Sequence, residues 1–178
     1  IGGDLACTGG AFHNASGIAL HCYGFKVAGD VFLNDNFEAD GEVRLLGATI
    51  GGNLACRGGT FKNAGGSALS CDRLKVTGVV FLYHNFEADG EVRLLGATIG
   101  GDLACIDGHF ACRRPAEEGS TRCATAIHLQ GATIYGSLLF RQPNTMVEGS
   151  IDLNHAHVRV LVDDAVSWPP ETVQDAKT

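Results

Sequence analysis

The sequence contains one tryptophan, one methionine and four prolines among its 178 residues. Aromatic residues make up only 7% of the chain, although 45% of the residues are hydrophobic and 25 are glycine. A disordered chain would lack the apolar residues, and a helical bundle would avoid the glycines, so both classes are excluded. The composition is typical of many short strands joined by tight turns.

Positive charge is also scarce, because 13 Lys and Arg residues stand against 20 Asp and Glu residues. A protein that binds the nucleic-acid backbone needs a basic face, so we expect no nucleic-acid partner. No apolar run approaches the ~20 residues of a membrane-spanning helix, so we expect no membrane insertion. The chain begins at Ile1 without a signal-peptide pattern, and we expect it to be a segment of a longer bacterial protein.

A repeat of 49 residues runs through the chain. The segment NFEADGEVRLLGATIGG at residues 36–52 returns unchanged at residues 85–101. A shorter motif, IGGDLAC or IGGNLAC, begins at Ile1, Ile50 and Ile99. Similarity within one chain at a fixed period indicates a repeat architecture.

Two families of apolar-x-apolar triplets divide each repeat into two coils. The first family lies at residues 5–7, 31–33, 54–56, 80–82, 103–105 and 138–140. The second family lies at residues 20–22, 43–45, 69–71, 92–94, 127–129 and 151–153. In the first family the spacing alternates between 26 and 23 residues until one coil lengthens to 35. The sequence therefore predicts an all-β fold, a right-handed parallel β-helix (a solenoid) of about six coils.

The orientation of the triplets follows from the two-residue period of a strand. The outer members are nearly all apolar and should face the lumen, whereas the middle members should face outward. Coils stack ~4.8 Å apart, so we expect Cys56 directly between Leu33 and Leu82. We interpret segments such as 47–50 and 58–61 as corners. A leucine-rich repeat fits less well, because glycine interrupts every stretch within about ten residues.

The alternation of GEVRLLGATIGG and GGDLAC over residues 1 to about 160 resembles the degenerate repeats of bacterial pentapeptide-repeat proteins and related right-handed β-helix proteins. Strict A-(D/N)-L-x-x pentads are absent. Coils of 23 and 26 residues also exceed the 20 residues that such pentads imply. The resemblance implies the fold and leaves the activity open, because function depends on sites.

We predict a β-helix repeat domain at residues 1–162, with an inserted loop at 111–124, and a C-terminal cap or tail at 163–178. The charged segment RRPAEEGSTR should make the loop leave the surface of the solenoid. Trp168 breaks the pattern near the C-terminus and is expected to shield the last coil. An open β-helix exposes unpaired strand edges, so we also expect self-association through the coil ends.

Seven cysteines are present, but no CxxC motif occurs, so we predict no metal site. Five of the cysteines occupy inward positions and should be buried apolar thiols: Cys7, Cys22, Cys56, Cys71 and Cys105. Buried free thiols favour a cytoplasmic location, although the sequence leaves the compartment open. Cys112 and Cys123 flank the inserted loop, where either a disulfide or two free thiols would fit.

Acidic residues gather at one corner: Glu38, Asp40, Glu42, Glu87, Asp89 and Glu91. Oxygen ligands on neighbouring coils suit calcium. The intervening corners, at residues 14–17 and 63–66, offer few carboxylates, so we interpret the cluster as a solvated acidic ridge.

The middle residues of the second triplet family form an outward stripe, and its charged members are His21, Arg44, Arg93, His128 and Asp152. We interpret this stripe as an interaction surface, because its groups repeat with the coil and do not converge on one point. A second outward row consists of Lys26, Thr49, Lys75, Thr98, Thr133 and His157.

The sequence therefore predicts a non-enzymatic structural or protein-interaction module with a protein partner, without catalytic residues and without a cofactor. One alternative is a carbohydrate-active β-helix enzyme, which needs a non-repeating groove with converging carboxylates. Another is an acidic DNA-mimic protein that binds a DNA-processing enzyme. Any chemistry should be sought near the irregular coils, at His109, His128, His155 and His157.

Overall fold

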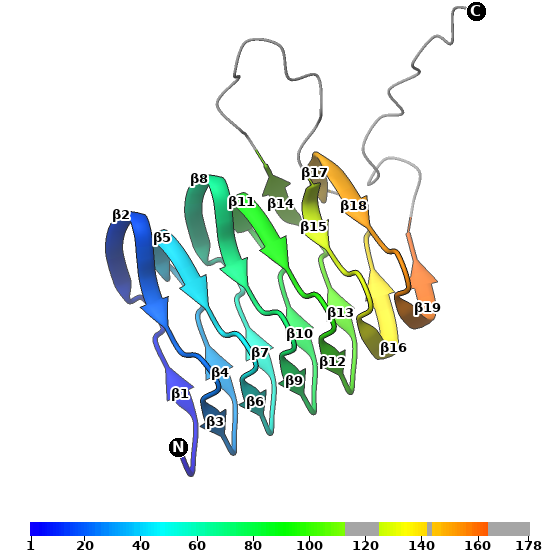
Figure 1. The fold of residues 1–178 in the computed structure, drawn as a ribbon, viewed down its shortest axis with the longest axis horizontal. Coiled ribbons are helices and arrows are strands. Elements are labelled where there is room, and N and C mark those ends of the chain that lie inside the picture. Colours follow the sequence, from blue (N-terminus) through cyan, green and yellow to red (C-terminus); the bar gives the residue numbers. More distant parts are fainter. Residues whose placement is uncertain (113–124, 142–143, 164–178) are drawn as a thin grey trace, which may run out of the picture.

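The computed structural model describes residues 1–112, 125–141 and 144–163, and within these ranges the regular elements are all β-strands. The strands stack in parallel into a solenoid of about six coils (Figure 1), which confirms the predicted fold class. No helix in the described ranges is long and apolar enough to cross a membrane. Most of the inserted loop, Cys123 and the C-terminal segment with Trp168 lie outside the described residues.

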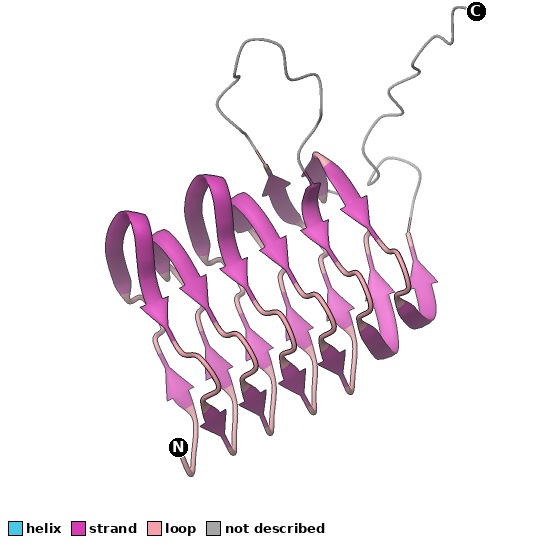
Figure 2. Ribbon diagram, in the orientation of Figure 1, coloured by secondary structure: helices cyan, strands magenta, loops and turns pink. Residues whose placement is uncertain are grey.

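An eleven-stranded sheet forms two sides of each coil (Figure 2). One side stacks the first triplet family in β1 (Leu5–Ala6), β4 (Val31–Phe32), β7 (Leu54–Ala55), β10 (Val80–Phe81) and β13 (Leu103–Ala104). The other side stacks β3 (Lys26–Val27), β6 (Thr49–Ile50), β9 (Lys75–Val76) and β12 (Thr98–Ile99). Both sides end on β16 (Thr133–Leu139), which pairs with β19 (His157–Val162).

An eight-stranded sheet forms the remaining sides. Its long strands are β2 (Ala11–His21), β5 (Glu38–Arg44), β8 (Thr60–Ser70) and β11 (Phe86–Arg93). Register shifts between these strands mark the corner at which the chain turns to the next side. In the later coils separate strands flank this corner, namely β14 (Gly108–Ala111), β15 (Thr125–His128), β17 (Met146–Glu148) and β18 (Ser150–Asp152).

The predicted register is confirmed. The pairing of β4, β7 and β10 places Cys56 between Leu33 and Leu82, and all three side chains are fully buried. Among the outward middle residues, Ser70 and Ala104 differ from the expectation because they are only 2% and 6% exposed. The hydroxyl of Ser70 donates a hydrogen bond to Glu42.

The segments interpreted as corners are partly strands, which corrects the sequence analysis. Thr49 and Ile50 form β6, and residues 60–61 begin β8. Each coil therefore has strand pairing on more sides than the two triplet families indicated. A strand of two residues, such as β6, is too short to display an alternating pattern, so periodicity does not reveal it.

A stack of phenylalanine rings runs through the lumen behind the eight-stranded sheet. Ring centroids lie 5.2–5.5 Å apart along the series Phe12, Phe37, Phe61, Phe86 and Phe110. The last four rings are fully buried. Aromatic pairs at this separation attract each other beyond the effect of burial alone, so the stack ties each coil to the next.

Glycine is required where neighbouring coils approach most closely. A Cβ atom at Gly51 would lie 2.2 Å from the carbonyl oxygen of Ala28, and a Cβ at Gly100 would lie 2.1 Å from that of Thr77. Real Cβ atoms do not approach backbone oxygens so closely. The glycines of the repeated IGG motif thus allow the coils to pack at this distance.

Candidate functional site

One residue from each coil stands in a single row on the outside of the eight-stranded sheet. We call this row the polar ladder, and it consists of His21, Arg44, Ser70, Arg93, His128 and Asp152. The structure thus brings the five predicted interaction residues into one line. Ser70, which was not among the nominated residues, separates the two arginines.

Glu42 links neighbouring coils beside the ladder. Arg44 Nη2 lies 2.7 Å from Glu42 Oε2, and Ser70 Oγ donates a 2.5 Å hydrogen bond to Glu42 Oε1. Burial alone would raise the pKa of Glu42. The hydrogen bonds from Arg44 and Ser70 and the nearby arginine charges outweigh burial, so the pKa of this carboxyl is lowered.

Arg93 is held in the same way by carboxylates on its own coil and on the preceding coil. Its Nη2 atom lies 2.9 Å from Asp72 Oδ2, and Nη1 lies 3.7 Å from Glu91 Oε2. Burial opposes the charge of Arg93, but Asp72 and Glu91 raise its pKa overall. The other oxygen of Asp72 accepts the backbone N–H of Leu95, which fixes the carboxylate.

Two nitrogens of the ladder are enclosed without a hydrogen-bond partner in the described part of the chain, Arg44 Nε and His128 Nε2. His128 Nε2 lies 3.9 Å from Glu91 Oε2, beyond hydrogen-bond reach. The ladder is therefore a row of mostly paired charges, and its two unpartnered nitrogens are closed off from solvent.

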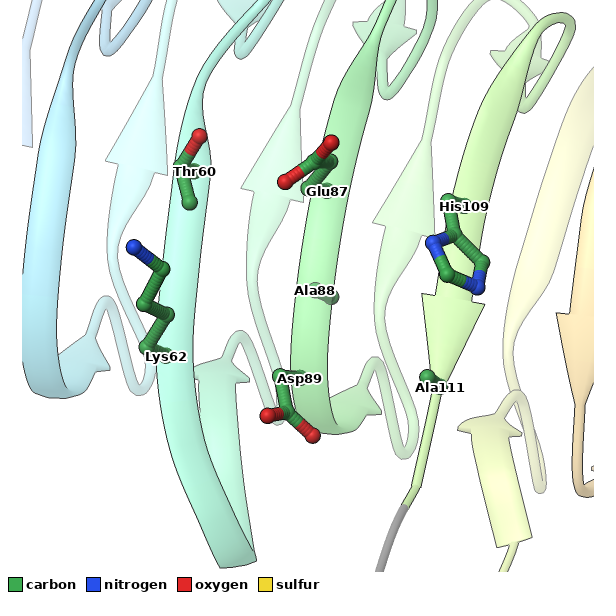
Figure 3. A pocket seen from close by; sticks show the side chains of 7 residues that line it. All are labelled: Thr60, Lys62, Glu87, Ala88, Asp89, His109 and Ala111. Carbon is green, nitrogen blue, oxygen red and sulfur yellow. The ribbon is translucent and has the colours of Figure 1, made fainter.

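A pocket lies elsewhere on the same sheet, across β8, β11 and β14 (Figure 3). Its volume is about 160 Å³, and its lining residues are Thr60, Lys62, Glu87, Ala88, Asp89, His109 and Ala111. We call it the β11 pocket. The sequence singles out Glu87, Asp89 and His109 for different reasons, and it does not predict that they share a pocket with Lys62 and Ala111.

Two side chains that line the β11 pocket have partners outside it. Lys62 Nζ donates to Glu38 Oε1 at 3.2 Å, and His109 Nε2 lies 2.9 Å from Glu148 Oε1. In contrast, Asp89 Oδ1 is enclosed by the protein and has no hydrogen-bond partner among the described residues.

The expected acidic ridge is interrupted, which corrects its description. In register, Thr60 stands between Glu38 and Glu87, and Lys62 stands between Asp40 and Asp89. The corner at residues 63–66, which was expected to intervene, bulges beyond these positions. Within the described ranges, no group of three or more His, Cys, Asp or Glu side chains is arranged to hold a metal ion.

The histidines nominated for chemistry lie apart. His109 is on β14 beside Glu148, and His128 is on β15 in the polar ladder. His157 pairs with Thr133 in the second outward row, and His155 is in a turn with a positive φ of 58°. The structure brings no two of these four side chains into one described contact.

Comparisons with protein-family models, with curated proteins and with solved structures give no match to this chain. The parallel solenoid is compatible with the resemblance to pentapeptide-repeat proteins at the level of the fold.

Proposed function

We propose that this chain is a non-enzymatic interaction module that presents the polar ladder to a protein partner from a rigid solenoid. The observation that carries the proposal is the unbroken register of the ladder through all six coils. Because the ladder strands of the inner coils are hydrogen-bonded to the coils on both sides, the ladder groups are held at fixed spacing. Binding a partner with matching spacing would therefore cost this chain little conformational entropy.

The chemistry of the ladder supports a polar partner surface. Arginine is common at the energetic centres of protein interfaces, and its fork binds carboxylates in two places. Asp152 adds an acidic end, where one carboxylate oxygen already accepts the backbone N–H of Asn154.

A carbohydrate-active enzyme is the second candidate, and the observation that favours it is the β11 pocket with its two carboxylates. Glu87 and Asp89 lie on one strand and repeat Glu38 and Asp40, so they are not a unique pair. The pocket volume of about 160 Å³ is also below the ~300–1,000 Å³ of typical ligand sites. The DNA-mimic alternative is weakened by Arg44, Arg93 and Lys62 among the acidic residues.

The repeat supplies matched variants for a test. Arg44→Ser with Arg93→Ser introduces the residue that already occupies this ladder at Ser70. Lys26→Thr with Lys75→Thr makes the equivalent change in the second outward row, where Thr49 and Thr98 are native. Proteins retained by the wild-type chain from cell extract are identified by quantitative mass spectrometry, and the retained protein is then purified.

We expect the arginine variant to bind this purified protein at least about tenfold more weakly than wild type, a loss of about 1.4 kcal/mol. The lysine variant should bind like wild type. Equal binding by both variants would show that the ladder is not the interface. A polysaccharide and ester screen decides the second candidate: activity that Glu87→Gln or Asp89→Asn abolishes in a folded protein would establish an enzyme at the β11 pocket.

A further inference from the structure

The two copies of the repeat differ in the surroundings of their Glu-x-Asp pairs. In the first copy, Asp40 stands in register with Lys62 on the next coil. The ammonium group of Lys62 donates to Glu38, the other acid of the pair, at 3.2 Å. The first pair is thus supplied with a cation by the chain itself.

In the second copy this cation is missing. The residue 49 positions after Lys62 is Ala111, and it stands in register with Asp89. Lys62 does not replace it, because its side chain runs away from β11 (Figure 3) and its Nζ atom donates to Glu38 on the preceding coil. The β11 pocket lies beside Glu87 and Asp89, and Ala111 forms part of its lining.

We propose that the β11 pocket binds an alkylammonium group from outside the chain, which takes the role that Lys62 has in the first copy. This site goes beyond the proposed function, because it contains no residue of the polar ladder and holds whether or not the ladder binds a protein. The ammonium group can come from a lysine side chain of a protein or from a free diamine, and the test separates these sources.

The chemistry of the pocket requires a donor. An ionised carboxylate can only accept hydrogen bonds, and an enclosed acceptor without a donor destabilises the protein. Asp89 Oδ1 is such an atom, but it is closed off from solvent, so an ammonium group in the pocket would balance the charge of this carboxylate rather than bond to this oxygen. An ammonium group offers three donors and a positive charge, which suits two neighbouring carboxylates. Ala88 and Ala111 provide apolar surface for the methylene stem.

The two nitrogen-bearing side chains at the pocket do not supply this donor. His109 lies 2.9 Å from Glu148, on the next coil, and Lys62 is bonded to Glu38. The volume of about 160 Å³ suits one side chain better than a chain of sugar rings. A calcium ion requires six to eight oxygen ligands, and the described residues of the pocket provide two carboxylates and one hydroxyl.

The test is a titration of the ¹⁵N-labelled chain followed by amide chemical shifts. The probes are N-acetyl-lysine methylamide, 1,5-diaminopentane, N-acetyl-arginine methylamide, the neutral N-acetyl-norleucine methylamide, and Ca²⁺. We expect an ammonium probe to shift the amides of Glu87, Asp89 and His109, and the neutral probe to leave them unchanged. Binding of the lysine derivative assigns a protein side chain as ligand, and binding of the diamine alone assigns a free amine.

Variants locate the site. Asp89→Asn should weaken binding of the ammonium probe at least tenfold, whereas Asp40→Asn, at the matched position of the first copy, should not. Ala111→Lys should fill the pocket from within and abolish binding. If this variant fails to fold, the comparison of the two asparagine variants still decides. Shifts caused by the neutral probe, by arginine alone or by Ca²⁺ alone, or equal losses in the two asparagine variants, would overturn the proposal, as would the absence of shifts with either ammonium probe.

Discussion

Replacing Phe61 by alanine is expected to lower the free energy of unfolding by about 3–5 kcal/mol. Phe61 is fully buried, and its ring lies 5.2 Å from that of Phe37 and 5.3 Å from that of Phe86. The substitution removes both ring contacts and leaves a cavity in a lumen that has no other element to fill it. Because each coil contacts only its neighbours, the defect weakens the coupling between the two halves of the solenoid.

Phe32 provides the matched control for Phe61. It lies on the coil before that of Phe61, but its side chain faces outward and is only partly buried. Phe32→Ala should cost less than half as much as Phe61→Ala. Urea denaturation followed by circular dichroism gives both values from the transition midpoints. Equal losses in the two variants would mean that the phenylalanine stack does not support the coils.

The chain is expected to lose stability steeply above pH 9, because three thiols are fully buried. Burial raises the pKa of Cys56, Cys71 and Cys105 from the ordinary value of 9.0. Above pH 9 these thiols stay protonated in the folded chain but ionise in the unfolded chain, so the unfolded state binds fewer protons. Stability therefore falls as the pH rises, by about 1.4 kcal/mol per pH unit for each thiol and about 4 kcal/mol for three. Below pH 9 the thiols have no such effect.

Cys56→Ala tests this origin of the pH dependence. The variant should be less stable at pH 7, but its slope above pH 9 should be shallower than that of wild type by about 1.4 kcal/mol per pH unit. Cys7→Ala is the control, because Cys7 is only partly buried in the first coil and should change the slope less. Denaturation midpoints at several pH values between 8 and 10.5 measure the slopes. Parallel curves for wild type and Cys56→Ala would contradict the account.

The fold could be predicted because the same residue types recur in register. The triplets around Leu33, Cys56 and Leu82 differ in side chain but share the inward pattern, and stacking them needs no information beyond their spacing. The phenylalanine stack was missed although the sequence carries its signal. Phe12, Phe37 and Phe61 are 25 and 24 residues apart, close to the coil length, and the same spacing continues to the fifth ring.

The β11 pocket could not be predicted from the sequence for a physical reason. Register shifts at the corner decide which residue of one coil faces a residue of the next. From the sequence, residues 63–66 were expected between the two acidic pairs. In the structure these residues bulge, and Lys62 lies in register between Asp40 and Asp89. The sequence shows that Lys62 in the first copy corresponds to Ala111 in the second. Only the strand register shows that both positions face an aspartate, so that the exchange removes a cation from the second pair.

Each inner coil stacks on partners 23 and 26 residues away, and nuclear Overhauser contacts between methyl groups measure this register in solution. In a sample with labelled leucine and valine methyls, Leu54 should show cross-peaks to both Val31 and Val80, because these buried side chains occupy adjacent coils ~4.8 Å apart. If Leu54 shows no contact with either valine, the register is wrong. The polar ladder and the β11 pocket would then have no structural basis.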